Sequence, residues 1–118
     1  MPDSEAKMRI SFLINERPPY KQTPANSAER ENQAQRRGVC QQEAMRAFIG
    51  HKLFTQPCNV SIEYWRATGQ SDGANIIGGV LDALEGIIYQ NDRQAVEILY
   101  IEHEATGNDR YQVIVREI

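Results

Sequence analysis

The sequence has few of the residues that would hold a small domain together by covalent bonds or metal ions. Its two cysteines, Cys40 and Cys58, do not form a Cys-x-x-Cys pair, and their spacing from His51 and His103 matches no zinc-ligand pattern. We therefore expect two reduced cysteines packed in the core. The chain also lacks an apolar run near the roughly 18 residues of a membrane span, and its start lacks a signal-peptide pattern. These absences favour a cytoplasmic protein with no membrane partner.

Size and composition indicate one ordinary globular domain. The chain has 118 residues, of which 41% are hydrophobic and 25% charged, enough to bury a core without disulfides. We expect residues 1–7 to form a disordered leader and residues 8–118 to form a single domain.

Net charge of −3 gives no indication of nucleic-acid binding, but its distribution is uneven. Residues 1–60 hold nine Lys and Arg against six Asp and Glu, whereas residues 61–118 hold four against ten. Such a division suits a site where carboxylates hold a metal and nearby cations hold phosphates. An unevenly charged but inert surface is the alternative.

The pattern of apolar and turn-forming residues predicts an α/β (α+β) domain with the element order β-α-β-α-β-β. Strands are expected at 8–14, 60–65, 95–101 and 111–115, with helices at 28–50, where Ser27 is the expected N-cap, and at 72–86. The composition of residues 106–109 predicts a hairpin turn. Together these elements favour a single mixed β-sheet of about four strands with two flanking helices.

The helix at 72–86 separates an apolar face from a polar one. An arc of about 140° collects its large aliphatic residues, which are Ile76, Ile77, Val80, Leu81, Leu84, Ile87 and Ile88. The opposite side carries Asp72, Asn75, Gly79 and Asp82. Because glycine is costly inside a helix, Gly78 and Gly79 indicate that something approaches the backbone closely, either a partner helix or a phosphate backbone.

Three aspartates near this helix are candidates for metal binding. Asp72 stands at the N-cap position, Asp82 lies mid-helix, and Asp92 follows the helix in a polar turn. Capping and turn roles explain Asp72 and Asp92 without any chemistry. If the three carboxylates converge, they can hold Mg²⁺, which polarises a phosphodiester and activates water.

The order of these motifs resembles that of the RusA-type Holliday-junction resolvases. The resemblance lies in Asp72-x-x-Asn75, Val80-Leu81-Asp82-Ala83-Leu84-x-Gly86 and Tyr89-x-Asn91-Asp92-x-Gln94-x-Val96, together with the opening Arg17-Pro18-Pro19-x-Lys21. It implies a mixed sheet flanked by helices, a homodimer, and Mg²⁺-dependent paired nicking of four-way DNA junctions in recombination and repair. Mn²⁺ is the alternative ion.

Carried over residue by residue, the resemblance assigns roles to individual positions. The family's first catalytic aspartate falls on Asp72, its late acidic ligand on Asp92, its helix aspartate on Asp82 and its motif asparagine on Asn75. We expect a junction endonuclease to use Asp72, Asp82 and Asp92 as catalytic metal ligands. The DNA-binding residues expected are Asn75 and the cations Arg17, Lys21, Arg36 and Arg37, which would hold the DNA backbone.

Two positions depart from the family pattern. A second motif aspartate is Ala74 here, and a helix lysine is Gly78. Asp82, or Glu63 on the second strand, is a candidate replacement for the lost carboxylate. The alternative functions are a non-catalytic RusA-like module for DNA binding or assembly, and an unrelated α/β interaction domain.

Overall fold

The computed structural model describes residues 8–118, so the expectation for residues 1–7 lies outside the described part. The elements are β1 (Arg9–Ile14), α1 (Ser27–Ala47), β2 (Cys58–Arg66), α2 (Gly73–Leu84), the short 3₁₀ helix η2 (Asp92–Gln94), β3 (Ala95–Glu104) and β4 (Arg110–Glu117). The predicted element order and mixed four-stranded sheet are confirmed. Within the described residues, neither helix combines the length and apolar character needed to cross a membrane.

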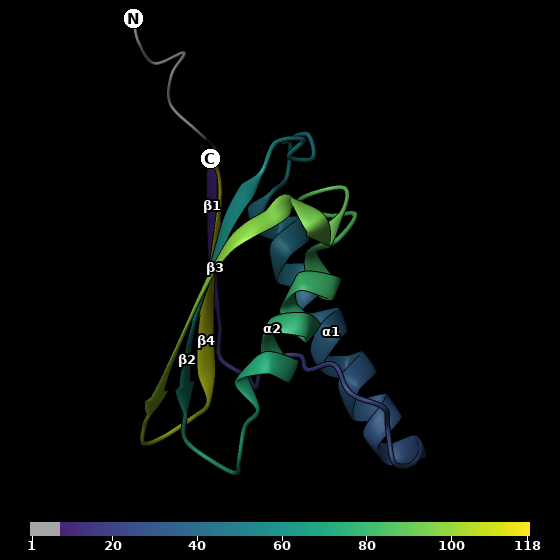
Figure 1. The fold of residues 1–118 in the computed structure, drawn as a ribbon. Helices are drawn as coiled ribbons and strands as arrows, with labels where there is room; N and C mark the ends of the chain where they lie inside the picture. Colours follow the sequence, from purple (N-terminus) through teal and green to yellow (C-terminus); the bar gives the residue numbers. More distant parts are fainter. Residues whose placement is uncertain (1–7) are drawn as a thin grey trace, which may run out of the picture.

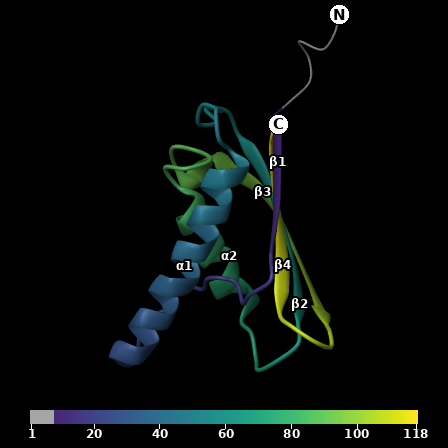
Figure 2. The same cartoon turned by 180° about the vertical axis from the view of Figure 1, so that it is seen from behind.

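The four strands form one sheet in the order β1-β4-β2-β3. β2 and β3 are parallel and are joined through α2, whereas β4 runs antiparallel to both β1 and β2. Figures 1 and 2 show both helices on the same face of the sheet, which leaves the opposite face uncovered. The crossover places the start of α2 next to the end of β2, where polar loop residues gather.

The prediction of a hairpin at residues 106–109 was wrong. β3 and β4 are not neighbours, because β2 lies between them, and their connection passes over the end of β2. The chain does reverse its direction at these residues, and Gly107 has a φ of 86°, a backbone conformation that favours glycine. Turn composition specifies a reversal of direction but does not specify which strands pair.

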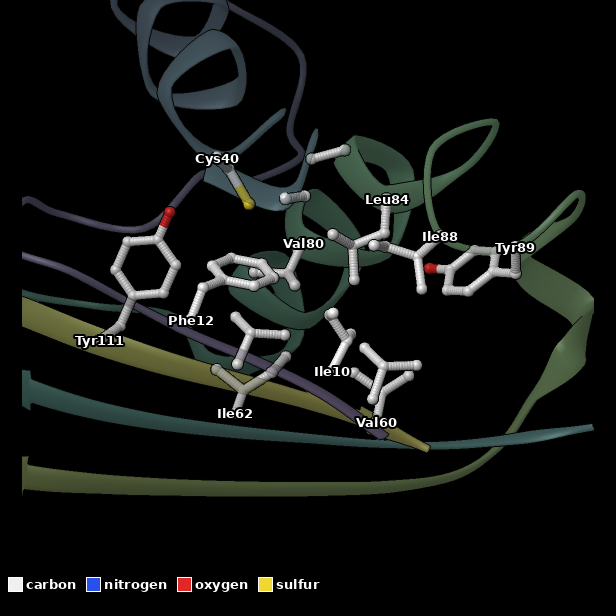
Figure 3. Packing of buried hydrophobic residues seen from close by; sticks show 14 of the residues in the cluster. Ile10, Phe12, Cys40, Val60, Ile62, Val80, Leu84, Ile88, Tyr89 and Tyr111 are labelled. Carbon is white, nitrogen blue, oxygen red and sulfur yellow. The ribbon is translucent and has the colours of Figure 1, made fainter. Parts of the chain in front are cut away.

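The core lies between the helices and the sheet (Figure 3). Alternate residues of β1, β2 and β4 point into it, and α2 contributes Ile76, Val80 and Leu84, followed by Ile88. Ile77, Leu81 and Ile87, also expected in the apolar stripe, are only partly buried at the margin. Cys40 and Cys58 are free and fully buried, and burial raises the pKa of each thiol to about 11. Both thiols are therefore poor nucleophiles at neutral pH.

Helix α1 differs from its predicted bounds at both ends. Asn26, rather than Ser27, is the N-cap, and its side chain accepts a hydrogen bond from the Glu29 backbone N–H at 2.9 Å. The only buried residues of the helix are Cys40 and Ala44, both in its second half. The first half, poor in large apolar residues, extends away from the sheet (Figure 1). Burial in the second half therefore holds α1 to the core.

Candidate functional site

A polar cleft opens where the end of β2, the start of α2, the segment after β1 and helix α1 meet. Its cavity volume is about 520 Å³. The lining consists of Arg17, Pro18, Tyr20, Gln22, Arg36, Tyr64, Gln70, Ser71, Asp72, Asn75 and Ile76. Four residues that the sequence nominated for function, Arg17, Arg36, Asp72 and Asn75, thus share one cleft.

Asp72 enters this cleft as the N-cap of α2. Its backbone is extended, and its Oδ1 accepts a hydrogen bond from the Asn75 backbone N–H at 3.3 Å. The residue is exposed, so its carboxylate combines a capping role with access to solvent and ligands. The capping interpretation of Asp72 is confirmed, and it does not compete with a role in binding.

The lining of the cleft includes two guanidiniums, those of Arg17 and Arg36, beside the carboxylate of Asp72. Arg17 donates from Nη2 to the Gln70 carbonyl at 3.0 Å. The guanidinium of Arg36 lies 5.0 Å from the centre of the Tyr20 ring, and within residues 8–118 it makes no ion pair. Burial and then the charge of Arg17 lower the pKa of Arg36. Arg17 pairs with Asp109, whose Oδ2 lies 3.9 Å from Arg17 Nε, so Arg36 is the guanidinium of the cleft that favours an anionic ligand.

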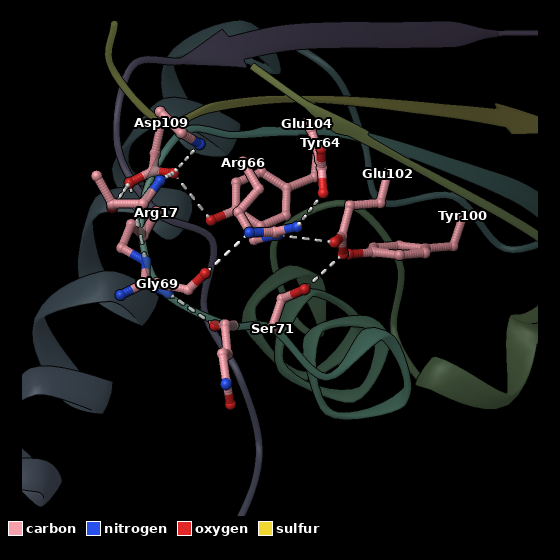
Figure 4. Close-up of polar contacts among 12 residues, drawn as sticks. Arg17, Tyr64, Arg66, Gly69, Ser71, Tyr100, Glu102, Glu104 and Asp109 are labelled. Atoms are coloured by element: carbon pink, nitrogen blue, oxygen red, sulfur yellow. Dashed lines mark hydrogen bonds and ion pairs between the residues drawn. The ribbon is translucent and has the colours of Figure 1, made fainter. Parts of the chain in front are cut away.

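The loop between β2 and α2 is fixed from one side by Asp109 (Figure 4). Its carboxylate accepts hydrogen bonds from the Ala67 backbone N–H at 2.7 Å, from Thr68 Oγ1 at 2.7 Å and from the Tyr64 hydroxyl at 3.2 Å. On the other side, Glu102 of β3 accepts from Ser71 Oγ at 2.7 Å. These two carboxylates set the path of the chain into Asp72. Sequence reasoning missed them because each contact joins residues at least 31 positions apart.

Asp109 therefore has a measurable effect on stability. Burial acts to raise the pKa of Asp109, but hydrogen bonds from Thr68, Ala67 and Tyr64 outweigh it and hold the pKa below its ordinary value. Asp109→Ala is expected to lower the free energy of unfolding by about 2 kcal/mol at neutral pH, because it leaves several donors unpaired. Urea denaturation measures this, with Asn108→Ala, at an exposed neighbouring position, expected to stay within about 0.5 kcal/mol.

The pH dependence of this difference has a defined sign. A carboxyl whose pKa is lowered by folding stabilises the protein above its ordinary pKa, and that contribution disappears as pH falls through the lowered native value. The gap between wild type and Asp109→Ala should therefore narrow in acid. A gap that stays constant from neutral to acidic pH would contradict this account.

Lys21, in the segment after β1, contacts α2 and does not line the cleft. Its Nζ is 3.3 Å from Asp82 Oδ2, and its backbone N–H donates to the Asn75 carbonyl at 2.8 Å. A Cβ added at Gly78 would lie 3.5 Å from Lys21 Cβ. Lys21 thus brings a cation to the helix face where the resemblance places a lysine, and it neutralises Asp82 there.

Gly79 is approached closely, as predicted, but the approaching group is neither a partner helix nor a phosphate. A Cβ at Gly79 would lie 2.5 Å from the backbone nitrogen of Tyr20 and 2.6 Å from the carbonyl carbon of Pro19. The proline-rich segment after β1 therefore lies directly on α2. This contact holds Arg17 and Tyr20 at the mouth of the cleft.

Asp92 lies at the far end of α2 from Asp72. Its backbone N–H donates to Glu85 Oε1 at 3.0 Å, just beyond the last helical residue. The twelve residues of α2 extend about 18 Å along the helix axis at 1.5 Å per residue, and Asp92 follows the end opposite to Asp72. Within residues 8–118, no group of three or more His, Cys, Asp or Glu residues is placed to hold a metal ion.

Glu63, the other candidate carboxylate, lies away from the cleft. It alternates with the buried Ile62 and Tyr64 and so belongs to the sheet face that carries no helix. Its Oε2 lies 2.6 Å from His103 Nε2. Of the four carboxylates that the sequence predicted as metal ligands, only Asp72 lies in the cleft in the part of the chain that the structure describes.

The arrangement of elements and motif residues agrees with one known family. The family model described as endodeoxyribonuclease RusA matches residues 13–116, which is nearly the whole chain. The chain belongs to the RusA endodeoxyribonuclease family. Membership of the RusA family implies Holliday-junction resolvase function, with branched DNA as the substrate, and RusA proteins are generally metal-dependent. No curated protein matches the chain.

Proposed function

We propose that this RusA-family protein binds four-way DNA junctions and resolves them by paired hydrolytic nicks that require Mg²⁺ or Mn²⁺. The observation that carries the proposal is the cleft in which Asp72 lies with Arg17 and Arg36. A carboxylate next to two guanidiniums suits a phosphodiester held beside a metal-binding oxygen. The function rests on this pairing of opposite charges and on the family.

The residues present fit a metal ion in one way only. Asp72, Asp82 and Asp92 do not fit a shared ion within one protomer, because α2 separates the first from the third. Asp72 alone fits the common mode for Mg²⁺, in which one or two carboxylates act with substrate phosphates and water. A bound divalent ion would supply a polarised phosphate and an activated water. Asp82 and Asp92 join this site only through a conformational change or a second copy.

DNA binding is assigned to the basic residues around the cleft. Arg17, Arg36 and Asn75 line it, Lys21 of the segment after β1 pairs with Asp82 of α2, and Arg37 is exposed on α1 next to Arg36. Backbone contacts by these cations would make affinity for a junction fall as salt rises.

Paired nicking of a junction needs two sites, and we propose that a second copy of the chain supplies the other. β3 is an edge strand with a single neighbour, β2. It exposes four large aliphatic side chains, Val96, Ile98, Leu99 and Ile101, by 39% to 58%. Because side chains alternate along a strand, Leu99 and Ile101 lie on the sheet face without helices and Ile98 lies on the other face. Exposed aliphatic residues on a long edge strand favour coverage by another chain.

Disrupting this strand should change the oligomeric state. Leu99→Lys is expected to convert a dimer into a monomer in analytical ultracentrifugation, because it places a charge among the exposed aliphatic residues. Ile49→Lys is the matched control, since Ile49 is 75% exposed but follows α1 and is not part of β3. A wild-type chain that sediments as a monomer at all concentrations would contradict the homodimer.

The non-catalytic module is the second candidate, and one observation favours it. Ala74 removes a carboxylate that the resemblance places beside Asp72, and no other nominated carboxylate lies in the cleft. A protein of this kind would hold junctions without cutting them.

Incubation with a synthetic four-way junction separates the two candidates. Binding is measured by electrophoretic mobility shift in EDTA, and cleavage in Mg²⁺ and in Mn²⁺. Symmetric, metal-dependent nicks support the endonuclease. Tight binding without nicks in either metal supports the module, and preference for linear duplex over the junction contradicts both.

A further inference from the structure

The cleft beside Asp72 has the size and lining of a site for one nucleotide rather than for a duplex. We propose that it takes a single nucleotide that has left the base stack at the strand crossover of a junction. The phosphate would lie at Arg17 and Arg36, and the base on the stack that Arg36 forms with Tyr20. The inference deepens the proposed function and rests on it for the choice of DNA.

Size is the first support. The cavity of about 520 Å³ lies in the range of about 300–1,000 Å³ typical of pockets for small ligands. The major groove of B-DNA is by itself about 12 Å wide, and the whole duplex is wider than its groove. A duplex therefore cannot enter the cavity. The walls come from β2, α2, α1 and the segment after β1, which are far apart in the sequence. Such a cavity is formed by the fold as a whole rather than by one loop.

The charge of the cleft suits a phosphate group. The Nε of Arg17 is buried and has no hydrogen-bond partner among the described residues, and the nearest carboxylate oxygen, Asp109 Oδ2, is 3.9 Å away. That oxygen already accepts the hydroxyl of Thr68. Asp109 therefore pairs with Arg17 only at long range, and Arg36 makes no ion pair within residues 8–118, so Arg36 is the guanidinium most available to an anion.

The remaining lining suits a nucleobase. The Arg36 guanidinium carbon lies over the Tyr20 ring, 5.0 Å from its centre, and bases out of the stack are bound on aromatic and guanidinium planes. Stacking on a side chain contributes about 1–3 kcal/mol per base. Asn75 Nδ2 donates to Gln22 Oε1 at 3.1 Å, and Gln22 in turn donates to Glu29 at 2.8 Å. These contacts fix two amides that can meet a base edge.

The consequence is a physical basis for choosing branched DNA. Extracting a nucleotide from an intact duplex costs a few kcal/mol, and the cost is smallest where a base is already unpaired or unstacked. When the arms of a junction are unstacked, a base at the crossover lacks a stacking neighbour that a base inside a linear duplex keeps. Occupancy of the cleft would therefore favour junctions even if all backbone contacts were shared with duplex DNA.

Nuclear magnetic resonance of the full ¹⁵N-labelled chain tests the pocket directly. Deoxynucleoside 5′-monophosphates are expected to shift the backbone amide signals of Gln70, Ser71 and Asn75 at millimolar concentration, and inorganic phosphate to bind more weakly. Arg36→Met should weaken nucleotide binding at least about fivefold. Arg46→Met, which removes an exposed guanidinium near the other end of α1, should not change it. Equal affinity for inorganic phosphate, or no shifts at these amides, would overturn the inference.

A junction carrying 2-aminopurine near its crossover tests the same pocket on DNA. The fluorescence of this base rises when it leaves the stack. The proposal is supported if the wild-type protein raises the 2-aminopurine fluorescence at one crossover position in EDTA and Arg36→Met does not. The two proteins are compared at the same fraction of bound junction, which fluorescence anisotropy measures. Junction binding without a rise at any crossover position overturns the pocket and leaves the proposed function intact. Nucleotide shifts in a chain that binds no junction would support the pocket and contradict the proposed function.

Discussion

Asp72→Asn is expected to reduce metal-dependent cleavage of a four-way junction by at least about 100-fold, while junction affinity in EDTA changes by less than about threefold. The substitution removes the charge that a metal ion or an attacking water would need. It keeps the N-cap of α2, because asparagine caps helices about as well as aspartate. Single-turnover cleavage rates and mobility shifts measure the two effects separately, and thermal unfolding checks that the fold is unchanged. Cleavage at the wild-type rate would exclude Asp72 from the chemistry.

Cleavage by the Asp82→Asn and Asp92→Asn variants can be compared with cleavage by Asp72→Asn, because Asp82 and Asp92 lie outside the cleft. Asp82→Asn loses an ion pair with Lys21 and is expected to retain cleavage to within about tenfold. If Asp92→Asn is as inactive as Asp72→Asn, the two residues act together despite the length of α2.

A mixture of the inactive Asp72→Asn and Asp92→Asn proteins then locates the shared site. Subunit exchange restores cleavage only if one protomer contributes Asp72 and its partner contributes Asp92, because a mixed dimer then has one intact site. Absence of restoration would place both residues in a single chain and require α2 or the segment after it to move.

Gly79→Ala is expected to destabilise the protein by about 3 kcal/mol or more. Its new methyl group would lie 2.5 Å from the Tyr20 backbone nitrogen, so either α2 or the segment at Pro19 must shift, and overpacking against backbone cannot be relieved by a rotamer change. Gly78→Ala is the matched control at the adjacent position. Its methyl group meets only the Lys21 side chain at an ordinary 3.5 Å, so helix propensity should make the variant more stable by up to about 1 kcal/mol. Urea denaturation measures both, and equal effects at the two positions would contradict the contact described for Gly79.

Local patterns predicted the elements well because they report on nearby residues. The alternation of Tyr111, Val113 and Val115 identified β4, and the aliphatic stripe beginning at Ile76 identified α2. Turn composition at 106–109 could not identify the partners of β3, since pairing depends on which strand already occupies the neighbouring position. The sequence likewise indicated a close contact at Gly79 without naming the Pro19 backbone as its source.

The residues of the candidate site likewise divide into those that local sequence patterns predicted and those that only the fold reveals. Asp72, Arg17 and Arg36 were nominated from residue type, motif order and charge distribution, and the fold brings them to one cleft. The sequence did not predict the roles of Asp109 and Glu102, because an acidic residue in a turn or an exposed strand has no local pattern that indicates a distant hydrogen-bond partner. Whether Asp92 reaches Asp72 depends on the length and direction of α2 and on the assembly, which spacing along the chain does not encode.

The contact between the Pro19–Tyr20 backbone and Gly79 has a kinetic consequence. It ties the segment that bears Arg17, Tyr20 and Lys21 to the helix that bears Asp72, so the cleft exists before DNA arrives. A preformed cleft avoids the entropy loss of ordering a loop on binding. Association with a junction can then proceed at the rate of oriented encounter, and the slow step shifts to the rearrangement of the DNA itself.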